Sequence, residues 1–274
     1  MDAFELIVPE RGPTAVLVEV PHGSIALAPG LEPEIIAPAE CLWRDADLHV
    51  DRLYQSVPTR GATLLAARYS RYVVDLNRAP NDVDAQTVPD HPSPRAHQPR
   101  GVVWRVSTDG RPAIFAPLTY AQLGDRLQRY HTPYHAALTA QLERLRLRFG
   151  FAVLVAGHSM PSVGRVGHSD SGARRADVVP GTRGRTSADA RVIDVVDTHF
   201  RAAGLSVSHD DPYQGGYTTQ HYGRPFEHWH AVQIELNRAI YMNEQTGDLR
   251  DRDAARVRSL LDELVTKLGR LDLR

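Results

Sequence analysis

Three short apolar runs constrain this chain most, because each is followed by a residue that can bind a metal ion or a proton. The runs cover residues 15–20, 153–156 and 232–234, and they have the length of buried strands. His22 follows the first run, His158 the second and Glu235 the third. In open α/β sheets, ligands bind beyond the carboxyl ends of the strands. Two histidines and one carboxylate at such ends are the residue types of a hydrolytic zinc site.

Length and charge bound the class of protein. The chain has 274 residues, which suits one large domain, and its net charge of −1 gives no reason to expect nucleic acid or an anionic membrane as a partner. The single cysteine, Cys41, cannot form an internal disulfide, and residues 1–5 lack the features of a signal peptide. No apolar run approaches the ~20 residues of a membrane span. We therefore expect one cytoplasmic domain over residues 1–274, with no nucleic acid and no membrane as partner.

Hydrophobic periodicity predicts strands that alternate with helices. Strands are predicted at residues 14–20, 63–67, 72–76, 151–156, 205–208 and 231–235. Helices are predicted at residues 45–54, 119–148, 188–203 and 251–268, with Pro133 bending or dividing the second. Loops are predicted at residues 79–101, 160–186 and 210–225. This order indicates an α/β fold with a mixed, mostly parallel sheet flanked by helices.

The two histidines need a third protein ligand if they bind a catalytic zinc ion. The acidic start of a predicted helix supplies Asp45 and Asp47, and the phase of the following residues favours Asp47 only slightly. His49 competes for this role, although it is also explained as part of one helix face. The chain has no compact HExxH motif. By spacing alone, ordinary loop histidines and a metal site therefore explain His22 and His158 about equally well.

Polar residues near the strand ends suggest a general base and a substrate anchor. Glu235 ends an apolar strand, so it must be solvated, paired or functional; the alternative to a general base is an ion pair with Arg238. Arg78 follows a predicted strand and is suited to bind a substrate carboxylate bidentately. The alternative for Arg78 is an ion pair with Asp75, and Arg71 is a further candidate for the anchor.

Two other segments contain histidines that are candidates for the site. The loop at residues 215–224 carries polar groups that could line a pocket, among them Gly216 and His221, although glycine pairs also occur in plain turns. His131 and His135 stand at positions i and i+4 of a predicted helix. That spacing can bind a metal ion but more often marks a packing face, which is the role we expect here.

With these pieces in order, the sequence resembles the N-formylglutamate amidohydrolase (formylglutamate deformylase) family. The resemblance covers nearly the whole chain and rests on short segments that follow the family's order. They are residues 20–24 (VPHGS), 45–49 (DADLH), 70–78 (SRYVVDLNR), 133–135 (PYH), 157–162 (GHSMPS), 215–217 (GGY), 221–223 (HYG) and 233–242 (QIELNRAIYM).

The resemblance implies a fold like that of zinc carboxypeptidases and aspartoacylases, with the metal at the strand ends. It implies one Zn²⁺ per chain, which another divalent transition metal could replace. The family's pattern places the metal on His22, His158 and an acidic residue of the 45–47 stretch, which we take as Asp47.

The same resemblance assigns the remaining roles. Glu235 matches the family's catalytic glutamate, and Arg78, with Asn77 beside it, matches the arginine that holds a substrate carboxylate in aspartoacylase-like enzymes. Two positions depart from the pattern, because the family usually has Asp where this chain has Ala156 and Arg where it has Gln220. The first change could weaken the support of a metal ligand, and the second could remove a contact to a substrate carboxylate.

These observations lead to the hypothesis of a zinc-dependent amidohydrolase acting on a small-molecule N-acyl amino acid. The first choice of substrate is N-formyl-L-glutamate, which would give L-glutamate and formate. One alternative is a zinc peptidase or amidase acting on a larger N-acyl or peptide substrate. Another is a catalytically inactive homologue that binds acidic ligands. We expect a monomer or a small homo-oligomer, a choice that the sequence does not decide.

Overall fold

The computed structural model describes residues 3–94, 99–166 and 170–274, so parts of two predicted loops, at 95–98 and 167–169, lie outside the described residues. By internal contacts the chain forms two compact units. The first comprises Met1–Glu5, Pro21–Leu48 and Ala67–Leu138, and the second comprises Leu6–Val20, His49–Ala66 and Thr139–Arg274. The prediction of one domain over residues 1–274 stays a prediction.

A six-stranded sheet, most of which belongs to the second unit, has the order β1-β3-β2-β4-β6-β5. Its strands are β1 (Phe4–Ile7), β2 (Val16–Val20), β3 (Thr63–Ala67), β4 (Ala152–Met160), β5 (Val178–Gly181) and β6 (Trp229–Asn237). β2 is parallel to both β3 and β4, β4 is parallel to β6, and β5 runs antiparallel to β6. The predicted α/β fold with a mixed, mostly parallel sheet is confirmed.

The central strands are apolar runs that are buried on both faces, as expected for parallel strands covered by helices. Every residue of β2, β4 and β6 is buried. In the register of β4 and β6, His158 pairs with Glu235, and Gly157 pairs with Ile234. Because neighbours along a strand point to opposite faces, His158 and Glu235 share one face of the sheet, and Gly157 and Ile234 share the other.

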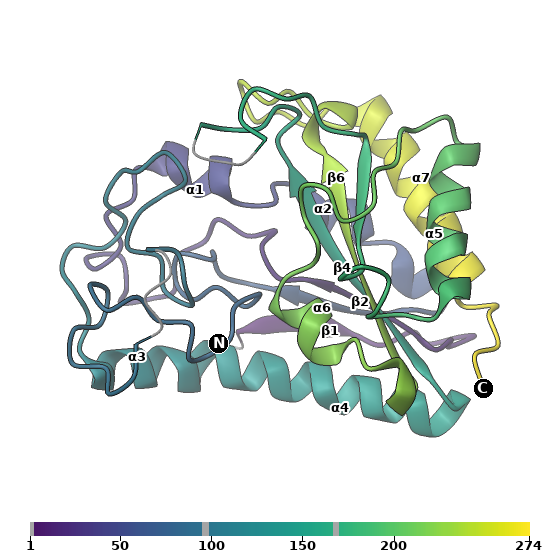
Figure 1. Ribbon diagram of the computed structural model, residues 1–274, viewed down its shortest axis with the longest axis horizontal. Coiled ribbons are helices and arrows are strands. Elements are labelled where there is room, and N and C mark those ends of the chain that lie inside the picture. The colour runs from purple at the N-terminus through teal and green to yellow at the C-terminus, as the bar shows by residue number, and fades with distance from the viewer. Residues whose placement is uncertain (1–2, 95–98, 167–169) are drawn as a thin grey trace. The chain divides into compact units, whose positions relative to one another are not determined.

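One helical layer of the second unit covers one face of the sheet (Figure 1), the face on which a Cβ at Gly157 would meet Tyr54. It consists of α2 (Val50–Tyr54), the 3₁₀ turn η1 (Val57–Arg60), α5 (Ala190–Ala202) and α7 (Asp251–Leu268). α7 packs against α2 and α5, and α2 packs against β4. A Cβ atom added to Gly157 would lie 2.5 Å from the ring of Tyr54, so helix and strand touch there through a glycine.

The short helix α6 (Tyr217–Tyr222) covers the opposite face, on which His158 and Glu235 lie. It packs on β4 and β6. The N–H of its N-cap residue, Gly216, donates to the side chain of Gln233, which shares the face of Glu235 because it is two residues away. The 3₁₀ turns η3 (Pro225–Glu227) and η4 (Arg238–Ile240) flank β6.

Two predicted helices of the second unit are confirmed. Helix α7 has the predicted bounds, and its buried residues recur at helical spacing, namely Ala254, Val257, Leu261, Leu264, Val265 and Leu268. Helix α5 begins slightly later than predicted because the Asp189 side chain accepts the N–H of Arg191 and so caps its start. Within the described residues, no helix combines the length and apolar character needed to cross a bilayer.

The first unit is built mainly of helices and turns. It contains α1 (Ala39–Asp45), α3 (Tyr120–Arg126), the π-helical turn η2 (Leu127–His131) and the start of α4 (Thr132–Phe149). A capping box of Thr119 and Gln122 fixes the start of α3. The buried guanidinium of Arg126 donates to the Glu34 carboxylate at 2.6 Å and to the Val73 carbonyl at 3.3 Å. It therefore joins α3 to two other segments of this unit.

Several predicted elements differ from the structure. Residues 72–76 form turns and irregular backbone and not a strand. The N–H of Val73 bonds to the Ser70 carbonyl, and the N–H of Asp75 bonds to the Val102 carbonyl. Residues 205–208 contain only an isolated bridge, from Val207 to Val178. The predicted 119–148 helix comprises α3, the π-helical turn η2 and α4, and Pro133 lies beside the change of helix type. It is the second residue of α4, directly after the π-helical turn, so its missing N–H coincides with a change of helix type.

The predicted 45–54 helix is divided by a short non-helical segment between α1 and α2. Two elements also lie inside segments that were predicted as loops. Strand β5 lies within the 160–186 segment and helix α6 within the 210–225 segment.

Candidate metal centre

In the first unit, acidic side chains flank His22 on two sides. The histidine is the second residue after β2, beyond Pro21, and it is buried. Its Nε2 lies 2.8 Å from Asp75 Oδ1, and its Nδ1 lies 3.4 Å from Asp47 Oδ2. Because an ionised carboxylate only accepts, a neutral imidazole donates its proton from Nε2 to Asp75. The Nδ1 lone pair then faces the side of Asp47.

Asp75 is the centre of a buried hydrogen-bond network. Besides His22, its carboxylate accepts from the Arg71 guanidinium at 2.6 and 3.2 Å, from the Trp104 indole at 2.9 Å and from the Asn77 backbone at 2.9 Å. Burial alone would raise its pKa, but Arg71 and then His22 hold the pKa of this carboxyl well below its usual range. Metal-binding imidazoles commonly donate to a carboxylate in this way.

The structure distinguishes Asp45 from Asp47. Asp45 Oδ2 accepts the Tyr72 hydroxyl at 2.7 Å and the Thr108 backbone N–H at 3.0 Å, and Asp45 Oδ1 accepts the Thr108 hydroxyl. The N–H of Asp47 donates to the carbonyl of His22 at 2.9 Å, which brings the two residues together. Asp45 therefore anchors the surrounding loops, and Asp47 faces the imidazole.

Two other sequence candidates are bonded to different groups. His49 has a left-handed backbone, with φ of 68°, and its Nε2 lies 2.8 Å from the Gly247 carbonyl. The Arg71 guanidinium, in addition to its bonds to Asp75, lies over the Trp104 ring with its Cζ 4.3 Å from the centroid. These contacts give Arg71 a role in holding Asp75.

Arg78 lies on a turn that two stacked histidines hold. The Nε2 atoms of His135 and His131 lie 3.0 Å from the carbonyls of Leu76 and Arg78 respectively. The two rings are 4.2 Å apart, so this pair has the packing role expected for it. The Arg78 Nη1 lies 3.6 Å from the Asp82 carboxylate, and about a third of its side chain is exposed. The turn therefore fixes the backbone of Arg78 and leaves part of its side chain accessible.

In the second unit, sheet register places His158 beside Glu235. The two residues are paired across β4 and β6, and both are buried. Side chains paired in this way lie close together on one face. Arg238, the ion-pair partner considered for Glu235, donates to the Ser159 hydroxyl at 3.1 Å.

The residues around Glu235 form a second polar network, which sequence reasoning missed. Gln233 Nε2 donates to Glu235 Oε1 at 2.9 Å, and Gln233 Oε1 accepts the Gly216 N–H at 2.9 Å. Burial raises the pKa of the Tyr213 phenol, and the nearby Glu235 charge raises it further. Arg175 lies over the Tyr213 ring at 5.0 Å. The available signal was the position of Gln233 two residues before Glu235, which puts both on one face of a strand.

The two departures from the family pattern have different surroundings. Ala156 is buried and pairs in register with Glu19 of β2, whose side chain is fully buried, so a carboxylate lies next to this position on the same face. Gln220 and His221 are exposed residues of α6. The His221 ring stacks on Tyr217 with the centroids 5.0 Å apart.

Three sequence-predicted ligands form a group that is suited to a metal ion. Among the described residues, the ligand atoms of His22, Asp47 and His158 all lie within 4.8 Å of one another, and the three residues are buried. Two imidazoles and one carboxylate are a donor set that divalent transition metals accept. The Asp75 carboxylate behind His22 supplies the second layer of support that such ligands need. The residues present therefore fit a metal ion.

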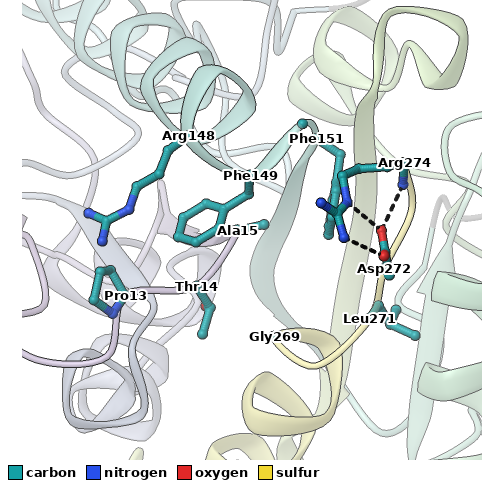
Figure 2. Close-up of a pocket in the computed structure, with 11 residues that line it drawn as sticks. Pro13, Thr14, Ala15, Arg148, Phe149, Phe151, Gly269, Leu271, Asp272 and Arg274 are labelled. Carbon is teal, nitrogen blue, oxygen red and sulfur yellow. Dashed lines mark hydrogen bonds and ion pairs between the residues drawn. The ribbon is translucent and has the colours of Figure 1, made fainter.

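A hollow of about 400 Å³ occurs elsewhere in the second unit (Figure 2). It is lined by Pro13, Thr14, Ala15, Arg148, Phe149, Gly150, Phe151, Gly269, Leu271, Asp272 and Arg274. Ala15 and Phe151 directly precede β2 and β4, so the hollow lies at the amino ends of these strands. His158 lies toward the carboxyl end of β4, so the hollow is separate from His158 and Glu235, the candidate site residues of this unit.

A mostly parallel α/β sheet with a buried His–Asp–His group and a buried glutamate defines a class of hydrolytic enzyme that could use a metal ion. A family model described as N-formylglutamate amidohydrolase matches residues 14–242. The chain belongs to the N-formylglutamate amidohydrolase family, and it is an amidohydrolase-family enzyme.

Relatives of known name extend over nearly the whole chain. The chain is 34% identical to an N-formylglutamate deformylase of Pseudomonas aeruginosa, over 95% of this chain and 96% of that protein. It is 32% identical to an N-formylglutamate deformylase of Pseudomonas putida, over 85% and 84%. It is also similar to the crystal structure of N-formylglutamate amidohydrolase from Ralstonia eutropha JMP134, with a TM-score of 0.88, 32% identity and coverage of 98% and 97%.

Proposed function

We propose that the protein is a zinc-dependent amidohydrolase that cleaves the amide bond of an N-acyl amino acid, with N-formyl-L-glutamate as the first substrate. The products would be L-glutamate and formate. The observation that carries the proposal is the buried group of His22, Asp47 and His158, whose ligand atoms lie within 4.8 Å of one another. The names of the relatives support the choice of substrate.

His22, Asp47 and His158 would hold the metal ion. Two histidines and one carboxylate match a common ligand set of catalytic zinc, which leaves one position open. When bound, zinc would polarise the acyl oxygen and lower the pKa of a water molecule toward ~7. The Asp75 carboxylate lies 2.8 Å from His22 Nε2, which supports Nδ1 as the atom that would bind the metal ion.

Glu235 would act as general base and then as general acid. Its carboxylate takes a proton from the attacking water as the water oxygen bonds to the acyl carbon. The same proton passes to the amine nitrogen when the carbon–nitrogen bond breaks. The buried position of Glu235, in register with His158, supports this role.

Arg78 would anchor a substrate carboxylate, with Asn77 beside it. A guanidinium binds a carboxylate through two parallel hydrogen bonds, which fixes the substrate's direction as well as its position. The partly exposed side chain of Arg78 supports this role. Gly216 and His221, at the start and within α6, are proposed to contact the substrate. Arg71 would act indirectly, by holding the Asp75 carboxylate.

Replacing Glu235 tests the mechanism. Wild type and Glu235→Gln, loaded with zinc, are compared by formate release from N-formyl-L-glutamate, with Glu263→Gln on the exposed face of α7 as control. We expect kcat of Glu235→Gln to fall about 10²- to 10⁴-fold, the range of general acid–base contributions, with zinc content unchanged. Full activity of this variant, or a wild type that takes up no metal, would overturn the proposal.

Varying the substrate tests the anchor. N-formyl-L-glutamate, N-formyl-L-leucine, N-acetyl-L-glutamate and a larger N-acyl peptide are compared for wild type and Arg78→Met. Loss of a hydrogen-bonded charge should lower kcat/KM for the preferred acidic substrate about 10- to 100-fold. Arg129→Met, an exposed helix position, is the control. Activity on the larger compound alone would replace the formyl substrate with the peptide or larger N-acyl class.

A further inference from the structure

Gln233 is a buried polar side chain that the proposed mechanism does not use. It lies in the middle of β6, where only 4% of its surface is exposed. In the sheet it pairs with Ala156 on one side and with Gly181 on the other. Neither neighbour has a polar side chain. Small residues therefore flank Gln233 on both sides, and beyond Ala156 the same row continues to the buried Glu19 of β2.

Its two hydrogen bonds define which way the amide points. Gln233 Oε1 accepts the backbone N–H of Gly216 at 2.9 Å, and Gln233 Nε2 donates to Glu235 Oε1 at 2.9 Å. A backbone N–H can only donate, so it requires the amide oxygen on its side. The amide nitrogen must then face Glu235. One oxygen of Glu235 is consequently met by a donor whose direction is fixed.

The loop that supplies this N–H is itself fixed against the sheet. A Cβ atom at Gly181 would lie 2.6 Å from the Gly215 nitrogen and 3.0 Å from the Tyr213 carbonyl oxygen. Gly215 has φ of 96°, a conformation that residues with a side chain rarely adopt. The loop therefore sits directly on β5, and the Gly216 N–H is held at a defined place above Gln233.

We propose that Gln233 is the positioning residue for Glu235. Its amide is held by the fixed Gly216 N–H and in turn holds one oxygen of Glu235, so that it sets the orientation of the carboxylate. The inference rests on the proposed function, because it assigns Gln233 a role through the general base. It predicts that loss of the amide lowers turnover while metal and substrate binding persist.

The first test removes the amide and keeps the side chain's length. Gln233→Met should lower kcat about 10- to 100-fold, the effect of one lost hydrogen bond to a charged group, with KM and zinc content close to wild type. Thermal unfolding and zinc content show whether the variant is folded. Gln55→Met, at an exposed glutamine that follows α2, is the matched control and should keep wild-type turnover.

The second test has a readout that a merely structural residue would not change. In Gln233→Glu, the new carboxyl group reproduces both hydrogen bonds while it is protonated, but it can only repel Glu235 once it is ionised. We expect kcat of this variant, relative to wild type, to be highest at acidic pH and to decline as pH rises. In wild type, the residue at position 233 contributes no such pH dependence to kcat, because an amide does not titrate.

The outcomes separate the inference from the proposed function. If Glu235→Gln is inactive while Gln233→Met keeps wild-type kcat, Gln233 has no positioning role and the mechanism stands. If Gln233→Glu follows the wild-type pH profile, the inference is overturned in the same way, even where Gln233→Met fails to fold. If Glu235→Gln itself remains fully active, the proposed function and the inference are both withdrawn.

Discussion

The two units of the molecule hold their site residues in different ways. In the first unit, His22 and Asp47 lie on turns, and their surroundings are fixed by charged hydrogen bonds centred on Asp75. In the second unit, His158 and Glu235 lie on paired strands, where backbone register sets their positions. The first arrangement depends on individual side chains that are far apart in the sequence. The second depends on a sheet that many residues stabilise together.

This difference predicts which kind of substitution should destabilise each unit most. A buried charged network is costly to interrupt, because each partner that is removed leaves another charge or polar group without its bond. A buried strand position responds instead to side-chain volume, because the helices pack closely on it. Three predictions test this contrast.

The largest effect is expected at the centre of the first network. Asp75→Ala leaves the Arg71 guanidinium and the Trp104 indole N–H without their carboxylate. Removing one partner of a buried ion pair costs about 3–5 kcal/mol, so the free energy of unfolding in urea should fall by that amount. Metal affinity should fall as well, because His22 loses its acceptor.

The matched control for this substitution is Asp82→Ala, which breaks the partly exposed pair with Arg78. Exposed pairs contribute about 0–1 kcal/mol, so this variant should unfold nearly as wild type does. Equal destabilisation by the two substitutions would show that the Asp75 network does not organise the first unit.

The same contrast explains which parts of the molecule the sequence predicts. The strands that contain the 14–20, 63–67, 151–156 and 231–235 segments are continuous apolar runs, and helices α5 and α7 have clear amphipathic spacing, so local pattern was sufficient. Residues 72–76 looked like a strand for the same reason. Their backbone groups bond to a turn and to the 102 segment and not to a sheet strand, however, and Tyr72 and Val73 pack in a cluster with Trp104.

The site shows the same division. His22 and His158 could be named from their places after apolar runs. The choice of Asp47 over Asp45 could not, because it depends on Tyr72 and Thr108, which bind Asp45 from distant parts of the chain. Strand β5 and helix α6 were missed because they are four and six residues long and are defined by their contacts with β6.

The second prediction concerns volume in the sheet. Gly157→Ala would place a Cβ atom 2.5 Å from the Tyr54 ring, so α2 or the ring must move. Overpacking of this kind costs about 1–3 kcal/mol, which the urea midpoint would report. Gly124→Ala is the control, because a Cβ there meets nothing within 4 Å, and it should stabilise helix α3 by about 0.5–1 kcal/mol. An unchanged Gly157→Ala variant would mean that the helix and strand are not closely packed.

The smallest effect is expected from pH in the first unit. Burial lowers the pKa of His131, so the unfolded chain binds its proton at a higher pH than the folded chain does. Stability from this group is therefore complete above the unfolded pKa of about 6.5 and decreases as pH falls below it. Acid also places positive charge between two stacked rings.

Hydrogen exchange at pH 7.5 and 5.5 measures this effect locally. Beyond the intrinsic pH dependence of exchange, the amides of Asn77 and Arg78 should lose protection in acid, whereas those of β4 should not. In His131→Gln the difference should diminish, because glutamine can still donate to the Arg78 carbonyl but does not titrate. Equal loss of protection in β4 would indicate a global change and not one in the turn.

The orientation of His22 has a consequence for how the site can be altered. Its two ring nitrogens face different partners, with Nδ1 toward Asp47 and Nε2 toward Asp75. An asparagine side chain reaches about as far as Nδ1, and a glutamine side chain about as far as Nε2. His22→Asn would keep a polar atom on the side of Asp47 and release Asp75, whereas His22→Gln would keep the contact to Asp75 and withdraw from Asp47. The two contacts of one imidazole ring can therefore be removed separately, each by one conservative substitution.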